Sequence, residues 1–187
     1  MGEQKIDVLI DYPTRQNKPT TFNVAKQRTY CFGRRYTFLD AWRQCRHHLY
    51  HLNHAMTSLA AKLPVTISNV AKFDDETVQD WDQFILRFIK LQDTLGARTY
   101  AALLDYLQEP SASMPMLDKL NRLEQLGFLS NADDWHLLRV LRNQFCHDYP
   151  QDNALKASYL NQSIEAVSLL KDAMTRIEQY LTNNGLL

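Results

Sequence analysis

The sequence predicts an all-α protein, an antiparallel helical bundle, and three observations support that prediction. Glycine is scarce, with five residues in 187, and few clusters of turn residues interrupt the middle and end of the chain. Apolar residues recur every three or four positions over long segments, which is the period of an amphipathic helix. The connections between those segments are short, as in antiparallel bundles. We therefore expect a helical domain over residues 34–187, preceded by an irregular N-terminal extension over residues 1–33.

The extension and the first two helices follow from local signals. KIDVLI fits a short strand, and the polar, turn-rich stretch after it leaves a short hairpin as an alternative to irregular structure. A helical period begins at Tyr36 and continues until Pro64 ends it. The second helix begins at the acidic residues 74–76, which suit a helix N-terminus, and runs to the neighbourhood of Gly96.

The rest of the chain contains four more predicted helices. A short one stops before Pro110, and the next is closed by Gly127. Another ends at Pro150, because proline disfavours helical geometry at the residue before it. The last is terminated by the turn that contains Gly185. We place these helices at residues 99–108, 116–125, 131–150 and 154–181.

Composition limits the function classes. The formal net charge is zero, so a global basic field gives no argument for nucleic-acid binding. The charge is uneven, however: residues 23–56 carry six basic side chains against the single acid Asp40, and residues 74–82 carry five acids without Lys or Arg. Solvated charged faces account for this pattern, and a functional basic patch is the alternative.

Cysteine usage and hydropathy indicate the compartment. Cys31, Cys45 and Cys146 show no CxxC spacing and fit reduced thiols in a cytoplasmic protein. No stretch approaches the roughly 18 apolar residues of a membrane span. We therefore expect a cytoplasmic protein without a membrane partner.

The segment LRNQFCHDYP, residues 141–150, concentrates polar chemistry at one end of a predicted helix. On a helical wheel, apolar side chains fall in an arc roughly 100° wide and form the predicted core stripe: Leu137, Leu138, Leu141 and Phe145. Polar side chains and a cysteine fall in an opposite arc, roughly 140° wide: Arg139, Arg142, Asn143, Cys146 and His147. A solvated helix face, with basic groups favoured by the helix dipole, explains the same pattern. Spacing alone leaves both interpretations open.

Residues 142–149, RNQFCHDY, match the R-x4-H-x-Y motif of the HEPN superfamily, with the Arg-Asn start common there. The approach to the motif, LEQLGFL followed by DDWHLLRVL, and the segment RFIKLQDTLG at residues 87–96 are also similar. The chain resembles most the HEPN toxins encoded beside minimal nucleotidyltransferase antitoxins, over residues 36–181. This resemblance implies an all-α bundle that dimerises through the motif face.

The resemblance also implies a function: a metal-independent RNA endonuclease that acts as a toxin, needs no cofactor, and has RNA and a nucleotidyltransferase antitoxin as partners. Arg142 would bind phosphate oxygens with its planar, charged fork, and His147 would move protons near neutral pH. Asn143 would orient His147 or bind the phosphate. Tyr149, otherwise a capping aromatic, would receive adenylate from the antitoxin, which silences the nuclease. We expect Cys146 to be a small space-filling residue rather than a nucleophile.

Two other hypotheses fit the sequence. In the first, the chain is a non-catalytic partner of a nucleotidyltransferase, in which Arg142 and His147 bind nucleotide or phosphate. In the second, the chain is a structural helical adaptor and the motif is incidental. Cleavage of RNA in the presence of a chelator separates the nuclease from both.

The first predicted helix carries a histidine cluster, RHHLYHLNH at residues 46–54. His47, His51 and His54 share one face, but no carboxylate or thiolate joins them there, so we expect no metal site. A solvated face is the plain interpretation. If the face instead lines a cleft, the side chains expected to contact the RNA backbone are Arg139, Arg43, Arg46, His47 and His51.

Overall fold

The computed structural model describes the backbone of residues 21–146 and 152–187, with side chains from residue 33 onward. In this part of the chain every regular element is helical and no strand occurs, which confirms the all-α prediction. The helices are α1 (Thr21–Leu59), α2 (Ile67–Val70), α3 (Asp75–Asp93), α4 (Tyr100–Tyr106), α5 (Met116–Gln125), α6 (Ala132–Cys146) and α7 (Asn153–Asn183). A 3₁₀ turn, η1 (Ala60–Lys62), follows α1, and a π-helical turn, η2 (Thr94–Thr99), joins α3 to α4.

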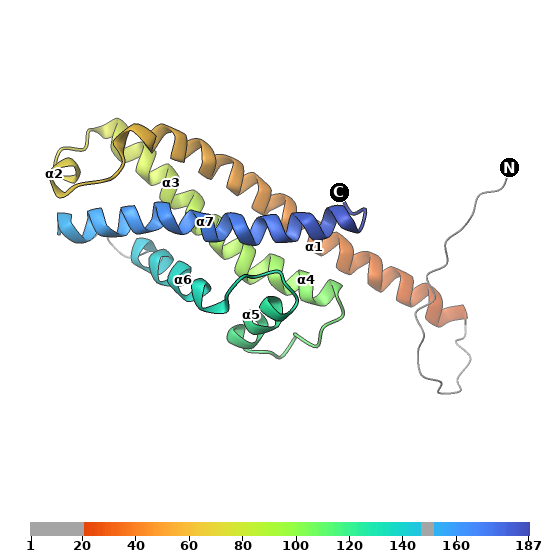
Figure 1. Cartoon of the computed structure of the whole chain (residues 1–187). Coiled ribbons are helices and arrows are strands. Elements are labelled where there is room, and N and C mark those ends of the chain that lie inside the picture. Colours follow the sequence, from red (N-terminus) through yellow and green to blue (C-terminus); the bar gives the residue numbers. More distant parts are fainter. Residues whose placement is uncertain (1–20, 147–151) are drawn as a thin grey trace.

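The long helices lie alongside one another and the shorter ones pack against them (Figure 1). α1 and α3 run in opposite directions and contact each other extensively, while α7 contacts α1, α2, α3 and α6. α3 also contacts α6, whereas α1 and α6 make no direct backbone contact over the described residues. α3 therefore separates the histidine-bearing helix from the helix that carries the motif.

Large aromatic side chains fill the core. Trp42, Trp81 and Trp135 come from α1, α3 and α6 and are almost fully buried. Burying a large apolar side chain contributes about 1.5–3 kcal/mol, so these helices are held together by their apolar faces. On α6, Leu138 and Leu141 are buried as predicted. Leu137 was predicted in the same stripe but is 41% exposed, because α6 turns the Trp135 side of its apolar arc inward instead.

α1 begins at Thr21, so residues 21–33, which we expected to be irregular, are helical. No proline lies between Thr21 and Leu59, and extending an existing helix costs far less than starting one. The packed part of α1 thus provides a helix that the preceding residues continue. Residues 1–20, with the alternative hairpin, lie outside the described part of the chain.

Gly96 does not end a helix, contrary to our prediction. α3 passes through η2 into α4 without interruption, so the helices predicted at 74–96 and 99–108 form one rod. A Cβ atom at Gly96 would lie 2.6 Å from Cζ2 of Trp135. The indole ring of Trp135 packs against the backbone at Gly96 and leaves no room for a Cβ there, so the glycine serves packing and not a turn.

Candidate functional site

A carboxylate from another helix fixes the motif arginine. Nε and Nη2 of Arg142 donate to Oδ1 and Oδ2 of Asp93, each at 3.0 Å, and Nη1 donates to Oδ1 of Asn143 at 3.2 Å. This hydrogen bonding to Asp93 raises the pKa of the guanidinium, which stays charged. Both side chains are partly exposed, and such pairs contribute only about 0–1 kcal/mol to stability. The main effect of the pair is therefore to orient the arginine.

Arg142 lies at the edge of a concavity of about 260 Å³ between the end of α3, η2 and α6. The almost fully buried Gln92 and Trp135 line its inner part. Arg139, Arg142 and Asn143 line it from α6. Arg139 is exposed and forms no ion pair within the part of the chain that the structure describes. The site thus combines two arginines and two amides around an aromatic wall.

The π turn η2 forms part of the wall of this concavity and packs against α1. The hydroxyl of Thr99 donates to the carbonyl oxygen of Thr94 at 3.1 Å, and Sγ of Cys45 lies 3.1 Å from the same hydroxyl. Burial raises the pKa of the Cys45 thiol to about 12, so this cysteine stays protonated and serves packing rather than nucleophilic chemistry. π turns recur at functional sites in helical proteins, where they distort an otherwise regular helix.

The structure gathers only part of the predicted motif. Arg139, Arg142 and Asn143 share the concavity, whereas His147 and Tyr149 lie outside the described residues. Cys146 was expected to fill a small space, but it is exposed at the end of α6. The position of His147 relative to Arg142 and Asn143 therefore remains a prediction.

The predicted RNA-contacting residues of α1 do not join Arg142 within one chain, because α3 lies between α1 and α6. The rings of His47 and His51 pack edge to face, with centroids 4.5 Å apart. Next to them, Nδ1 of His48 lies 3.5 Å from Nη1 of Arg87 on α3. Burial, and then the Arg87 charge, lower the pKa of His48, and the pKa of His51 is lowered by the same causes. These rings favour the neutral form.

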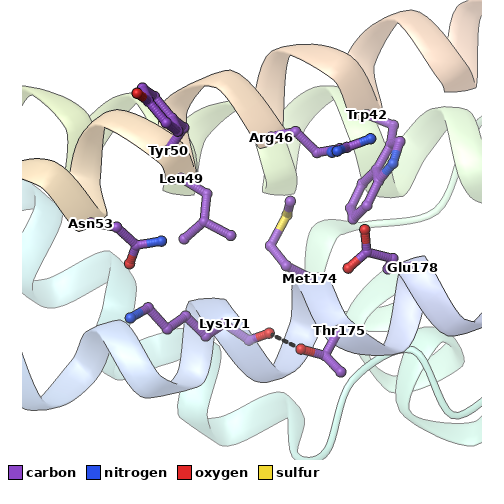
Figure 2. Close-up of a pocket in the computed structure, with 9 residues that line it drawn as sticks. All are labelled: Trp42, Arg46, Leu49, Tyr50, Asn53, Lys171, Met174, Thr175 and Glu178. Atoms are coloured by element: carbon purple, nitrogen blue, oxygen red, sulfur yellow. Dashed lines mark hydrogen bonds between the residues drawn. The ribbon is translucent and has the colours of Figure 1, made fainter.

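Arg46 and Arg43 also lie away from the motif. Arg43 is exposed on α1, and Arg46 lines a second concavity, of about 410 Å³, between α1 and α7. Figure 2 shows Arg46 and Lys171 projecting from these facing helices, with Leu49 and Met174 side by side between them. Contact of these α1 residues with RNA stays a prediction that would require a second chain or an extended ligand.

Comparisons with known proteins leave the family open. No family model, curated protein or solved structure matches the chain. Among the described residues, no group of three or more His, Cys, Asp or Glu side chains is placed to hold a metal ion. No helix in the described ranges is both long enough and apolar enough to cross a membrane.

Sequence reasoning missed Asp93, Gln92 and Gly96, which position or line the site. All three lie in RFIKLQDTLG, the segment that resembles the second long helix of the HEPN toxins. The resemblance rests in part on this segment. It could not assign Asp93 to Arg142, because the two residues are 49 positions apart in the chain.

Proposed function

We propose that the chain is a metal-independent RNA endonuclease of the HEPN type, active as a homodimer and paired with a nucleotidyltransferase antitoxin. The observation that best supports this proposal is Arg142, held by both oxygens of Asp93 at the edge of a concavity that also contains Arg139 and Asn143. A fixed guanidinium at an open site suits the recognition of a phosphate group.

The proposed reaction is transesterification within the RNA. The ribose 2′-oxygen attacks the adjacent phosphorus, the bond from phosphorus to the 5′-oxygen of the next nucleotide breaks, and a 2′,3′-cyclic phosphate remains. One histidine takes the proton of the 2′-hydroxyl and a second gives a proton to the leaving 5′-oxygen. His147 supplies one of these groups and the partner protomer's copy supplies the other. Arg142 stabilises the extra negative charge on the phosphorane.

The decisive test is cleavage of a single-stranded RNA by the pure protein in the presence of EDTA. We expect cleavage in the wild type and its loss in Arg142→Ala and His147→Ala, with dimer mass and melting temperature close to those of the wild type. Arg122→Ala is a matched control, since it removes a similar arginine–carboxylate pair elsewhere in the fold. Unchanged cleavage by the Arg142 and His147 variants would refute the proposal.

The antitoxin part of the proposal has its own test. Tyr149 lies two positions after His147, so an adenylate on its oxygen would place a bulky anion beside the motif. We expect the intact mass of protein co-expressed with a cognate nucleotidyltransferase to rise by one or more adenylate units, and Tyr149→Phe to abolish the gain. Nucleotide binding without any RNA cleavage would instead support the non-catalytic alternative.

A further inference from the structure

We infer that the outward face of α1, together with Arg87 of α3, forms an accessory site that holds single-stranded RNA beside the cleavage site. This inference deepens the proposed function and rests on it, because it names where the rest of the substrate lies. Bases of the strand stack on the rings of α1, and its phosphates bind Arg87. An arginine without a carboxylate, a chain of rings and a basic path to Arg142 support it.

Arg87 differs from the other partly buried arginines in the described part of the chain. Those others each form an ion pair with an aspartate or glutamate: Arg34, Arg122, Arg142 and Arg176. Arg87 forms no such pair with any described residue, and its Nε is buried without a hydrogen-bond partner. Its Nη1 lies 3.5 Å from Nδ1 of His48, which is a weak contact. A partly buried guanidinium normally has an anionic partner, so this one lacks the group that would offset its desolvation.

The groups around Arg87 are basic. Burial and then the charge of Arg87 lower the pKa of both His48 and His51. Every other titratable group that contributes to these two shifts is also basic, and these further groups are His47, His54 and Lys90. No acidic side chain of the described ranges takes part. The cluster therefore attracts a negatively charged ligand.

A chain of aromatic rings extends from His48 along the surface of α1. The ring centroids of His48 and His47 are 5.9 Å apart, and those of His47 and His51 are 4.5 Å apart. The centroid of Tyr50 follows at 5.2 Å from that of His51. Tyr50 is 71% exposed, and Figure 2 shows its ring on the side of α1 that points away from α7. Unpaired bases stack on tyrosine and histidine rings, so this surface offers places for several bases.

The side chains of this face suit single-stranded RNA better than a membrane. Between residues 43 and 54, the positions of α1 within one outward arc of roughly 100° are basic or aromatic: Arg43, His47, Tyr50, His51 and His54. A helix face that binds a membrane instead carries large apolar side chains that insert among the lipids. Cationic groups interleaved with exposed rings bind phosphates and bases of one strand at the same time.

Lys90 connects this face to Arg142. Lys90 is exposed and stands three positions after Arg87 and three before Asp93, so these side chains turn around α3 in steps of roughly 60°. Asp93 binds Arg142 at the far end of this path. A helix is about 10–12 Å wide, which about three nucleotides of a stacked strand span at about 3.4 Å each. One short strand can therefore lie on the rings of α1 and reach the motif with its next phosphates.

The first experiment measures binding of a 2′-O-methyl oligouridylate of about eight nucleotides to the full-length protein by fluorescence anisotropy in EDTA. Because this probe has no free 2′-hydroxyl, its binding does not depend on the proposed reaction. Tyr50→Ala should weaken binding about tenfold through lost stacking, and Tyr50→Phe should bind like the wild type. Tyr36→Ala removes another exposed tyrosine of α1 and should leave the affinity unchanged. Equal affinities of the wild type and Tyr50→Ala would overturn the inference.

Arg87→Gln tests the phosphate contact with the same probe. It should weaken binding about tenfold and reduce the slope of log affinity against log salt by about 0.7, as expected for one phosphate on a single strand. Arg176→Gln removes the same charge from a partly buried arginine of α7 and should leave both quantities nearly unchanged. An unaltered salt slope in a folded Arg87→Gln protein would contradict the assignment of a phosphate to Arg87.

The histidines should make binding stronger in acid. The pKa values of His48 and His51 are lowered, and a nearby phosphate favours their protonated forms. Affinity for the probe, whose own charge stays constant, should therefore rise as the pH falls from about 7.5 to about 5.5. The rise should be smaller in a His48→Gln/His51→Gln double variant. An equal rise in both proteins would contradict contact between these rings and the strand.

RNA cleavage separates this inference from the proposed function. On an unmodified RNA of the same length, Tyr50→Ala and Arg87→Gln should raise KM and leave kcat nearly unchanged. Specific binding of the probe without RNA cleavage would keep the accessory site and reject the endonuclease. RNA cleavage with a KM that neither variant changes would keep the endonuclease and reject the site. Binding to vesicles of phosphatidylcholine and phosphatidylglycerol, without binding of the probe, would also overturn the inference.

Discussion

Two arginine–carboxylate pairs in this protein have almost the same geometry but lie in different surroundings. Arg142 of α6 binds both oxygens of Asp93, and Arg122 of α5 binds both oxygens of Glu109, at 2.9 and 2.8 Å. In each pair the remaining Nη1 donates to an amide oxygen, that of Asn143 or of Gln125. Exposure of the two arginines is also similar.

The two pairs differ in the groups that surround them. Arg122 ties α5 to the chain just after α4, and hydrogen bonding to Arg122 lowers the pKa of Glu109, as expected for a structural ion pair. Arg142 faces a concavity with a second arginine and a buried amide. A forked ion pair therefore gives no evidence of function by itself. The groups that surround it, and the space left for a ligand, carry that information.

The difference between the two pairs is tested most directly by removing the negative charge from each. Asp93→Asn should lower the kcat of RNA cleavage roughly 10- to 100-fold, because it releases the orientation of Arg142, whereas KM changes little. Glu109→Gln should leave both constants unchanged. Steady-state kinetics on one RNA oligonucleotide would measure the contrast.

Stability provides the control for that experiment. Both substitutions remove a partly exposed ion pair, so each should cost about 1 kcal/mol or less in denaturant unfolding. A positioning role for Asp93 also requires that the pH profile of cleavage keep its shape, since the proton-transfer groups are untouched. Equal kinetic losses in Asp93→Asn and Glu109→Gln would remove the distinction between the two regions.

Glycine substitutions test the same two regions through the backbone. Gly96→Ala should destabilise the fold by about 1–3 kcal/mol, because its Cβ overlaps Trp135 and the surrounding packing must shift. Gly127, after α5, has a φ of +80° and open space around a Cβ, so Gly127→Ala should cost about 1–2 kcal/mol through backbone strain alone.

The two glycine variants should differ in RNA cleavage more than in melting temperature. Gly96→Ala displaces a wall of the concavity that Arg142 lines and should slow cleavage, whereas Gly127→Ala should not. Chemical denaturation and cleavage kinetics on both variants would provide the two measurements. Unaltered cleavage by a folded Gly96→Ala protein would show that this wall is not part of the site.

The smallest expected effect is in thiol chemistry. Exposed Cys146 should react with iodoacetamide at pH 8 at least about tenfold faster than Cys45, whose pKa is raised to about 12 by burial. Because Cys45 contacts Thr99 of η2, Gly96→Ala should speed its labelling more than Gly127→Ala does. Peptide mass spectrometry would measure the labelling rate of each cysteine. If both glycine variants accelerate Cys45 labelling equally, η2 opens only when the whole protein unfolds.

The helices were largely predictable because periodicity and terminating residues are local properties. Pro64 and Gly127 end helices near the predicted positions, and the helix predicted at 116–125 is α5. Gly96 misled the prediction, since glycine is a frequent helix terminator. Its actual role depends on Trp135, a residue 39 positions away that no local rule connects to it.

The site was less predictable than the fold. The wheel correctly placed Leu138 and Leu141 in the core and Arg139 and Asn143 outside it, because that division depends only on spacing. A helical wheel cannot show which other helix packs against each side of α6. For that reason the pairing of Asp93 with Arg142 was not predicted, and Leu137 was wrongly placed in the core. Likewise, Arg46 and His51 looked equivalent on one helix, yet they lie toward α7 and α3 respectively.

The π turn η2 decides which face of the rod is buried after Gly96. A π turn holds one residue more than the α-helical turn it replaces, which offsets the later positions by roughly 100°. The buried positions Leu91 and Leu95 are accordingly followed by Thr99, Leu103 and Leu104, while Arg98 is exposed. If the same residues formed a regular α-helix, Arg98 would take the place that Thr99 has now and would point towards the core. The π turn therefore keeps the charged Arg98 outside and the apolar positions after it inside.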